Sequence, residues 1–175
     1  PRLRAPLGLD LRTPTPITDA ALARRLERPQ YPRSNAYDPW WIIDNLMGPH
    51  PLWLVESLCQ VTELQTGSRV LDLGCGKALT SIFLAREFGL RVTAADLWVA
   101  AADNQALIEA AGVADRVVAV HAEAHALPFE PESFDPIVSL DAYQYFVPDD
   151  RYLLYLSRCL RPGWTHGLAL PRRAA

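Results

Sequence analysis

The sequence is poor in several features that mark whole classes of protein. It has three cysteines among 175 residues, Cys59, Cys75 and Cys159, and none forms a C-x-x-C pair, so neither a disulfide framework nor a zinc site is predicted. No apolar run reaches the roughly 18 residues that a membrane-spanning helix needs, and the basic start lacks the apolar stretch of a secretory signal. We therefore expect reduced thiols, a cytoplasmic location and no membrane partner.

The sequence also lacks an excess of positive charge. The 17 Lys and Arg residues and 20 Asp and Glu residues give a formal net charge of -3. Because a sequence-independent nucleic-acid binder needs a basic face, we expect no nucleic-acid partner and favour a small-molecule one. His121 and His125 have no third ligand in view, so no metal site is predicted.

The residues that are present divide the chain into three segments. Half of the composition is apolar, which suits one globular domain with a real core. Residues 1–30 are expected to form an arm rich in proline and arginine, with a short helix over 17–28 that Thr18 or Asp19 opens. Residues 31–66 are expected to form a helical cap and residues 67–175 the core.

Two pairs of residues predict where the cap helices begin. In each pair a residue suited to the N-cap position precedes a proline suited to the first turn. These pairs predict helices near 39–46 and 51–64, after Asp38 and His50.

After Gly67 the pattern changes to short apolar runs that alternate with amphipathic segments, which is typical of βαβ units around a parallel sheet. The chain is therefore predicted to have an α/β fold. Strands are expected at 70–73, 91–95, 117–121, 137–140 and about 164–170. Helices are expected from Leu79 to near Gly89, over 99–111, and along the face of Tyr152, Leu153, Leu156, Cys159 and Leu160, with Asp149 or Asp150 as the last helix's cap.

A glycine pair follows the first of these strands. Gly74 and Gly76 allow a tight strand-to-helix turn in which a ligand can lie against bare backbone at a helix N-terminus. A dinucleotide fingerprint would need a small residue at Leu79, and a phosphate-binding P-loop would need Ser or Thr at Ala78. The turn is therefore predicted to hold a different cofactor.

The segment VLDLGCGKA, residues 70–78, resembles motif I of the class I S-adenosylmethionine-dependent methyltransferases, with Ala78 in place of the family's third glycine. The resemblance implies that Asp72, Gly74, Cys75 and Gly76 surround the amino-acid end of this cofactor. It also implies that Asp96 binds both ribose hydroxyls with Leu97 beside it, that Glu123 and Ala124 flank the adenine, and that Asp141 lies at the strand end that faces the transferred methyl.

Further segments resemble the family in the same order, including Leu127-Pro128-Phe129 and Leu160 to Gly163, so that the similarity covers residues 69–171. The fold that it implies is a Rossmann-like parallel sheet of order 3-2-1-4-5 flanked by helices. The family's final antiparallel hairpin is expected to be absent, since the sequence ends at Ala175. The fifth strand would then be an exposed edge, which we expect to offer a homodimer contact.

The function that the resemblance implies is in-line transfer of a methyl group to a small-molecule acceptor. Candidate bases, in falling order, are Asp141, Tyr143, Tyr145 and His50. Two alternatives remain open: a truncated, cofactor-binding but inactive partner or regulatory protein, and a nucleotide-dependent oxidoreductase, which Leu79 disfavours.

Overall fold

The structure is a computed structural model that describes residues 19–146 and 151–169 of the chain. The helices before the sheet are α1 (Asp19–Leu26), the 3₁₀ helix η1 (Ser34–Ala36), α2 (Pro39–Asn45) and α3 (Pro51–Cys59). The elements that follow are β1 (Arg69–Leu73), α4 (Leu79–Phe88), β2 (Arg91–Asp96), α5 (Ala101–Ala110), β3 (Val117–His121), β4 (Ile137–Leu140), η2 (Tyr143–Tyr145), α6 (Tyr152–Ser157) and β5 (His166–Ala169).

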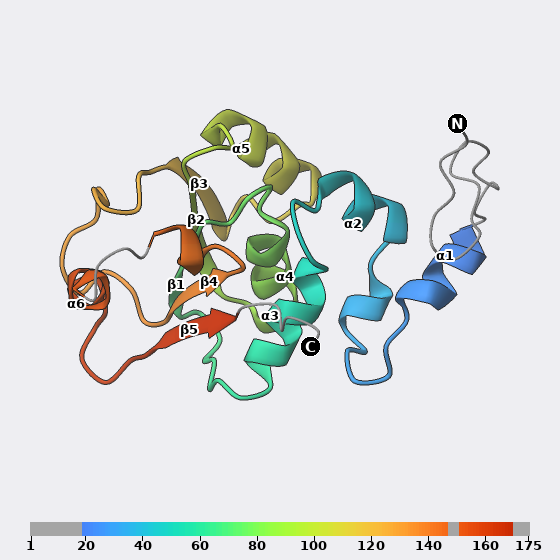
Figure 1. The fold of residues 1–175 in the computed structure, drawn as a ribbon, viewed down its shortest axis with the longest axis horizontal. Helices are drawn as coiled ribbons and strands as arrows, with labels where there is room; N and C mark the ends of the chain where they lie inside the picture. The colour runs from blue at the N-terminus through green and yellow to red at the C-terminus, as the bar shows by residue number, and fades with distance from the viewer. Residues whose placement is uncertain (1–18, 147–150, 170–175) are drawn as a thin grey trace, which may run out of the picture.

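The strands form one parallel sheet in the order β3-β2-β1-β4-β5, which confirms the predicted topology (Figure 1). β1 lies at the centre and pairs with β2 and β4 on its two sides. Chain order reverses at β1, since β2 and β3 lie on one side of it and β4 and β5 on the other. In open parallel sheets, ligands bind beyond the carboxyl ends of the strands at such a switch point.

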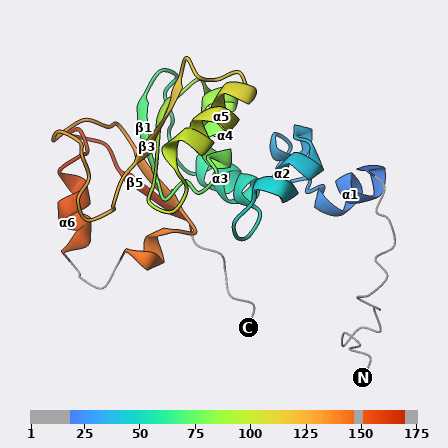
Figure 2. The same cartoon turned by 90° about the horizontal axis from the view of Figure 1, so that it is seen from above.

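Helices cover both faces of the sheet, as a parallel sheet with buried strands requires. Figure 2 shows α6 on one side of the sheet and α3, α4 and α5 on the other, with α1 and α2 beyond them. Successive side chains of β1 alternate between these layers: Val70 belongs to the core under α4, and Leu71 to the core under α6. Asp72, two residues after Val70, therefore faces α4.

Several element boundaries differ from the expected ones. α5 begins at Ala101, because the backbone amides of Trp98 and Val99 bond to the Asp96 carboxylate and make a turn before the helix. α3 ends at Cys59, where the last turn tightens and the amide of Val61 bonds to the carbonyl of Leu58 at 3.1 Å. The N-cap of α6 is Arg151, and the expected caps Asp149 and Asp150 lie outside the described residues, as does Thr18.

Both predicted caps of the N-terminal helices are confirmed. The Asp38 carboxylate accepts hydrogen bonds from the amides of Trp40 and Trp41 at the start of α2. Nδ1 of His50 accepts from the amide of Trp53 at 3.3 Å at the start of α3. Burial lowers the pKa of His50 to about 4, so the ring is neutral at pH 7 and Nδ1 is free to accept.

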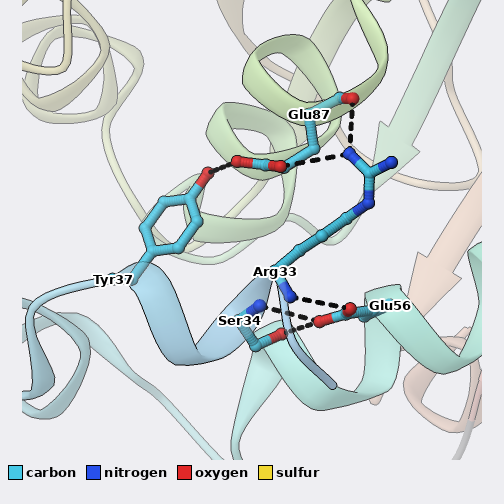
Figure 3. A network of polar contacts seen from close by, with 5 residues as sticks. All are labelled: Arg33, Ser34, Tyr37, Glu56 and Glu87. Carbon is cyan, nitrogen blue, oxygen red and sulfur yellow. Dashed lines mark hydrogen bonds and ion pairs between the residues drawn. The ribbon is translucent and has the colours of Figure 1, made fainter. Parts of the chain in front are cut away.

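Two carboxylates fix the segment before α2 onto the core (Figure 3). Buried Glu56 of α3 accepts from the amide of Arg33 at 3.0 Å and from the amide and hydroxyl of Ser34 at 2.7 and 2.5 Å. Glu87 of α4 accepts from the Arg33 guanidinium at 3.1 Å and from the Tyr37 hydroxyl at 3.1 Å. These bonds tie the N-terminal segment to two different helices, which sets where α2 lies.

Candidate functional site

A cavity of about 300 Å³ lies at the carboxyl ends of the strands, at the switch point. Its size is at the lower end of the range typical of small-molecule sites. Most of the residues predicted to form the site line it: Gly74, Cys75, Gly76, Asp96, Leu97, Glu123, Ala124, Asp141 and Tyr145. Asp72, Tyr143 and His50 are not among its lining residues.

The glycine turn forms the floor of this cavity. Gly74 and Gly76 have φ values of 74° and 54°, in the left-handed region that glycine adopts without strain. Ala78, in place of the family's third glycine, also lies there with φ 57°, which costs a non-glycine residue roughly 1–2 kcal/mol. The turn is therefore kept with alanine in place of the family's third glycine, at some cost in backbone strain.

Gly74 is also required for close packing. A Cβ added to it would lie 2.4 Å from the Cβ of Ala142 and 2.9 Å from Cζ of Phe146. The loop after β4 therefore approaches the turn at a distance that only glycine permits.

The Asp96 carboxylate holds the turn in place from the end of β2. Oδ2 accepts from the Gly76 amide at 2.8 Å, and Oδ1 accepts from the amides of Trp98 and Val99 at 2.8 and 3.0 Å. A carboxylate has about four lone-pair sites, so these three bonds leave one for a further donor. The carboxylate can therefore still accept from a ligand in the cavity, and its contact with both ribose hydroxyls stays a prediction.

Asn104 of α5, which was not among the site residues predicted from the sequence, also holds this turn. Its Nδ2 donates to the Gly76 carbonyl at 2.8 Å, and the side chain is almost fully buried. The signal available in the sequence was an asparagine among the apolar positions of a predicted helix, since a buried side-chain amide needs hydrogen-bond partners. Gly76 is therefore bonded through its N–H to Asp96 and through its carbonyl to Asn104.

Asp72 is fully buried at the end of β1 and is not among the residues that line the cavity. Its Oδ2 accepts from the hydroxyls of Thr80 and Ser81, the latter at 2.6 Å. Burial raises the pKa of Asp72 to about 6, and the two hydroxyls partly oppose this rise. Asp72 thus ties β1 to α4, and direct contact with a cofactor stays a prediction.

Glu123 forms a hydrogen-bonded pair with His125 on the wall formed after β3. Its Oε1 lies 2.9 Å from Nδ1 of His125, and its Oε2 accepts from the His125 amide at 2.9 Å. These bonds lower the pKa of Glu123, so the group is a carboxylate at neutral pH. His125 itself lines the cavity, although it was not among the site residues predicted from the sequence. Among the described residues there is no cluster of three or more groups that could hold a metal ion.

The ends of β4 and the N-terminal segment form the other wall. Asp141 has φ 55°, and its Oδ1 accepts from the side-chain Nε2 of Gln144 at 3.0 Å. A Cβ added to Gly48 would lie 2.6 Å from Asp141 Oδ2, so the loop after α2 packs directly on this carboxylate. Tyr145 is 64% exposed at the rim, and its ring lies 5.6 Å from that of Trp98. The structure therefore brings Asp141 and Tyr145, but not Tyr143, to the cavity.

The one lysine among the lining residues donates its side-chain hydrogen bond to α2. Lys77 follows the glycine turn, and its Nζ donates to the backbone carbonyl of Asp44 in the last turn of α2 at 3.0 Å. A cation at a helix C-terminus is favourably placed. Lys77 thus connects the glycine turn to the N-terminal segment.

The chain is similar to known proteins along this same core. A family model described as a methyltransferase domain matches residues 70–163. The methyltransferase GfsG of Streptomyces halstedii is 31% identical over 115 residues, which cover 63% of this chain and 40% of the relative. A demethylmenaquinone methyltransferase of Clavibacter sepedonicus is 34% identical over 135 residues, which cover 74% of this chain and 51% of the relative. The chain thus spans about half or less of the length of these relatives.

Among solved structures, the chain resembles the [4+2]-cyclase SpnF with a TM-score of 0.63 and 25% identity. The match covers 70% of this chain and 47% of that one. The match supports the fold described above.

Proposed function

Because this chain belongs to the class I S-adenosylmethionine-dependent methyltransferases, we propose that it binds S-adenosylmethionine in the cavity and transfers its methyl group to a small-molecule acceptor. The observation that carries this proposal is the 2.8 Å hydrogen bond between the Gly76 amide and Asp96 Oδ2. The glycine turn and the acid at the end of the neighbouring strand were predicted to form two halves of one cofactor site. They meet in one cavity.

The residues of the cavity fit this cofactor. Bare backbone at Gly74 and Gly76 leaves space for its amino-acid end, and the remaining lone pair of Asp96 suits a ribose hydroxyl. Leu97 and Ala124 offer apolar contacts to a planar base, and Glu123 offers an acceptor. When bound, the sulfonium supplies an activated methyl group, so the protein does not have to activate the donor.

The contribution of the protein to transfer is then to position the acceptor and exclude water. The acceptor would enter between Asp141 and the rim that includes Tyr145, in line with the methyl-sulfur bond. If the acceptor must lose a proton, Asp141 is the better-placed base, since Tyr143 packs on Tyr152 outside the cavity lining. A small acceptor is supported by the net charge of -3 and by the engagement of Lys77 with α2.

Transfer of radiolabelled methyl groups from S-adenosylmethionine to a panel of phenols, hydroquinones and amines tests this function. We expect label in one of these acceptor classes, and loss of that label in the Asp141→Asn variant if Asp141 is the base. Binding of S-adenosylhomocysteine without transfer to any acceptor would favour the alternative of an inactive partner protein. Protection against thermal unfolding by NADH in place of S-adenosylhomocysteine would favour an oxidoreductase.

We also propose that the chain forms a homodimer through β5 and works in the cytoplasm. Within the described residues, β5 pairs with β4 alone, so its other edge presents unpaired backbone groups that favour strand addition. All three cysteines are free thiols, which suits a reducing compartment, and no helix in the described ranges is long and apolar enough to cross a membrane. Sedimentation velocity is expected to show a concentration-dependent dimer, which a proline at Leu168 should abolish; a monomer at all concentrations would contradict it.

A further inference from the structure

His125 lies on the segment after β3, next to the pair of residues predicted to flank the adenine. Both of its ring nitrogens have polar partners. Nδ1 lies 2.9 Å from Glu123 Oε1, and Nε2 lies 2.8 Å from the backbone carbonyl oxygen of Phe146. The ring therefore connects the segment after β3 to the segment after β4.

The chemistry of the two partners determines the protonation state of this ring. A carboxylate and a backbone carbonyl only accept hydrogen bonds, so both nitrogens must donate. A neutral imidazole carries one N–H, and either tautomer would set a lone pair against one of the two oxygens. Only the imidazolium satisfies both contacts.

The groups around His125 make this contact part of the cavity wall. The ring packs against Tyr152 of α6 at 5.0 Å, and the Tyr152 hydroxyl donates to the Ala124 carbonyl at 3.1 Å. The Phe146 ring packs on Tyr152 as well, at 6.1 Å. Because Glu123, Ala124 and Phe146 all line the cavity, the histidine, the tyrosine and the two segments form one connected wall.

We propose that His125, as an imidazolium that donates to Glu123 and to the Phe146 carbonyl, is a positioning residue that holds this wall in the shape that binds the cofactor. The inference rests on the proposed function in one respect, namely that the cofactor occupies this cavity. His125 is part of the cavity wall, and the role proposed for it is to hold that wall in place, with no part in the chemical step.

The sign of the pH dependence follows from the neighbours of His125. The hydrogen bond that the ring donates to Glu123 raises the pKa of His125, and the bond that it donates to the Phe146 carbonyl raises this pKa further. Tyr152 of α6 is the titratable group that packs on the His125 ring, and Tyr143 of η2 and Tyr155 of α6 pack on Tyr152 in turn. Burial raises the pKa of Tyr152, so its hydroxyl stays neutral. The imidazolium bridge is therefore complete at acidic pH and is lost as pH rises through the raised pKa of His125.

The test measures S-adenosylhomocysteine binding by calorimetry at about pH 6 and about pH 8.5, on either side of the pH range in which a histidine side chain loses its proton. The variants are His125→Gln and, as a matched control, His121→Gln, which changes an exposed histidine at the end of β3. Because His125 is about half exposed, we expect a modest effect: binding by the unchanged protein weakens about two- to fivefold between the two pH values. His125→Gln should bind equally weakly at both, and His121→Gln should behave as the unchanged protein.

A pH dependence that persists in His125→Gln would overturn the proposal, since other groups would then account for it. If no variant binds S-adenosylhomocysteine at either pH, the proposed function fails, and NMR titration of the histidine rings tests the bridge alone. The bridge requires a His125 pKa above the ordinary value of about 6.5 that falls in Glu123→Gln. An unshifted His125 would contradict it.

Discussion

Replacing Asp96 with alanine is expected to weaken S-adenosylhomocysteine binding by about 1.5–3 kcal/mol, or about 10- to 150-fold. The variant loses the acceptor for a ribose hydroxyl and, at the same time, the acceptor for the Gly76, Trp98 and Val99 amides. The glycine turn would then be held only by Asn104 on the other side of Gly76. Isothermal titration calorimetry measures the change.

Two variants separate the ribose contact from a general loss of charge. Asp103→Ala removes an exposed acid from the first turn of α5 and should leave the affinity unchanged. Asp96→Asn keeps one oxygen that can accept from the Trp98 and Val99 amides, so its affinity should be intermediate. Unchanged affinity in Asp96→Ala, with a circular dichroism spectrum like that of the parent, would remove Asp96 from the cofactor site.

Replacing Gly74 with alanine is expected to lower the free energy of unfolding by about 2–5 kcal/mol and to reduce cofactor binding with it. Roughly 1–2 kcal/mol of this arises because alanine is strained at φ 74°. A further 1–3 kcal/mol, approximately, arises because the new Cβ would lie 2.4 Å from the Cβ of Ala142. Urea-induced unfolding followed by tryptophan fluorescence measures the sum.

The chain offers a control that isolates the strain. Gly112 has φ 69°, but a Cβ added to it would meet nothing within 4 Å, so Gly112→Ala should show the strain alone. Adding Ala142→Gly to Gly74→Ala should relieve the contact and recover a part of the loss, as a double-mutant cycle would quantify. Equal losses in Gly74→Ala and Gly112→Ala would show that the loop after β4 does not pack on the turn.

The sheet could be predicted well because its signals are local. Each strand is a short apolar run, and the glycines at 74, 89 and 112 end or separate elements where the chain must adopt positive φ. The start of α5 could not be placed because it depends on a side chain from another element. The Asp96 carboxylate holds the two amides that would otherwise belong to the first turn of the helix.

The backbone part of the site could be predicted, but the direction of individual side chains could not. Asp72 shares the α4 face of β1 with Val70, and only the hydroxyls of Thr80 and Ser81 decide that its carboxylate bonds there. Tyr143 and Tyr145 lie two residues apart in a 3₁₀ turn, which points them to different sides. The role proposed for His125 depends on its hydrogen bond to the Phe146 carbonyl, which is distant in sequence and is brought near only by the fold.

A crystal structure of the chain with S-adenosylhomocysteine would test the proposed cofactor site most directly. We expect the homocysteine end against the backbone of Gly74 and Gly76, a ribose hydroxyl within hydrogen-bond distance of Asp96, and the adenine between Leu97 and Ala124. A ligand bound elsewhere, or a ribose that leaves Asp96 bonded only to backbone amides, would contradict it.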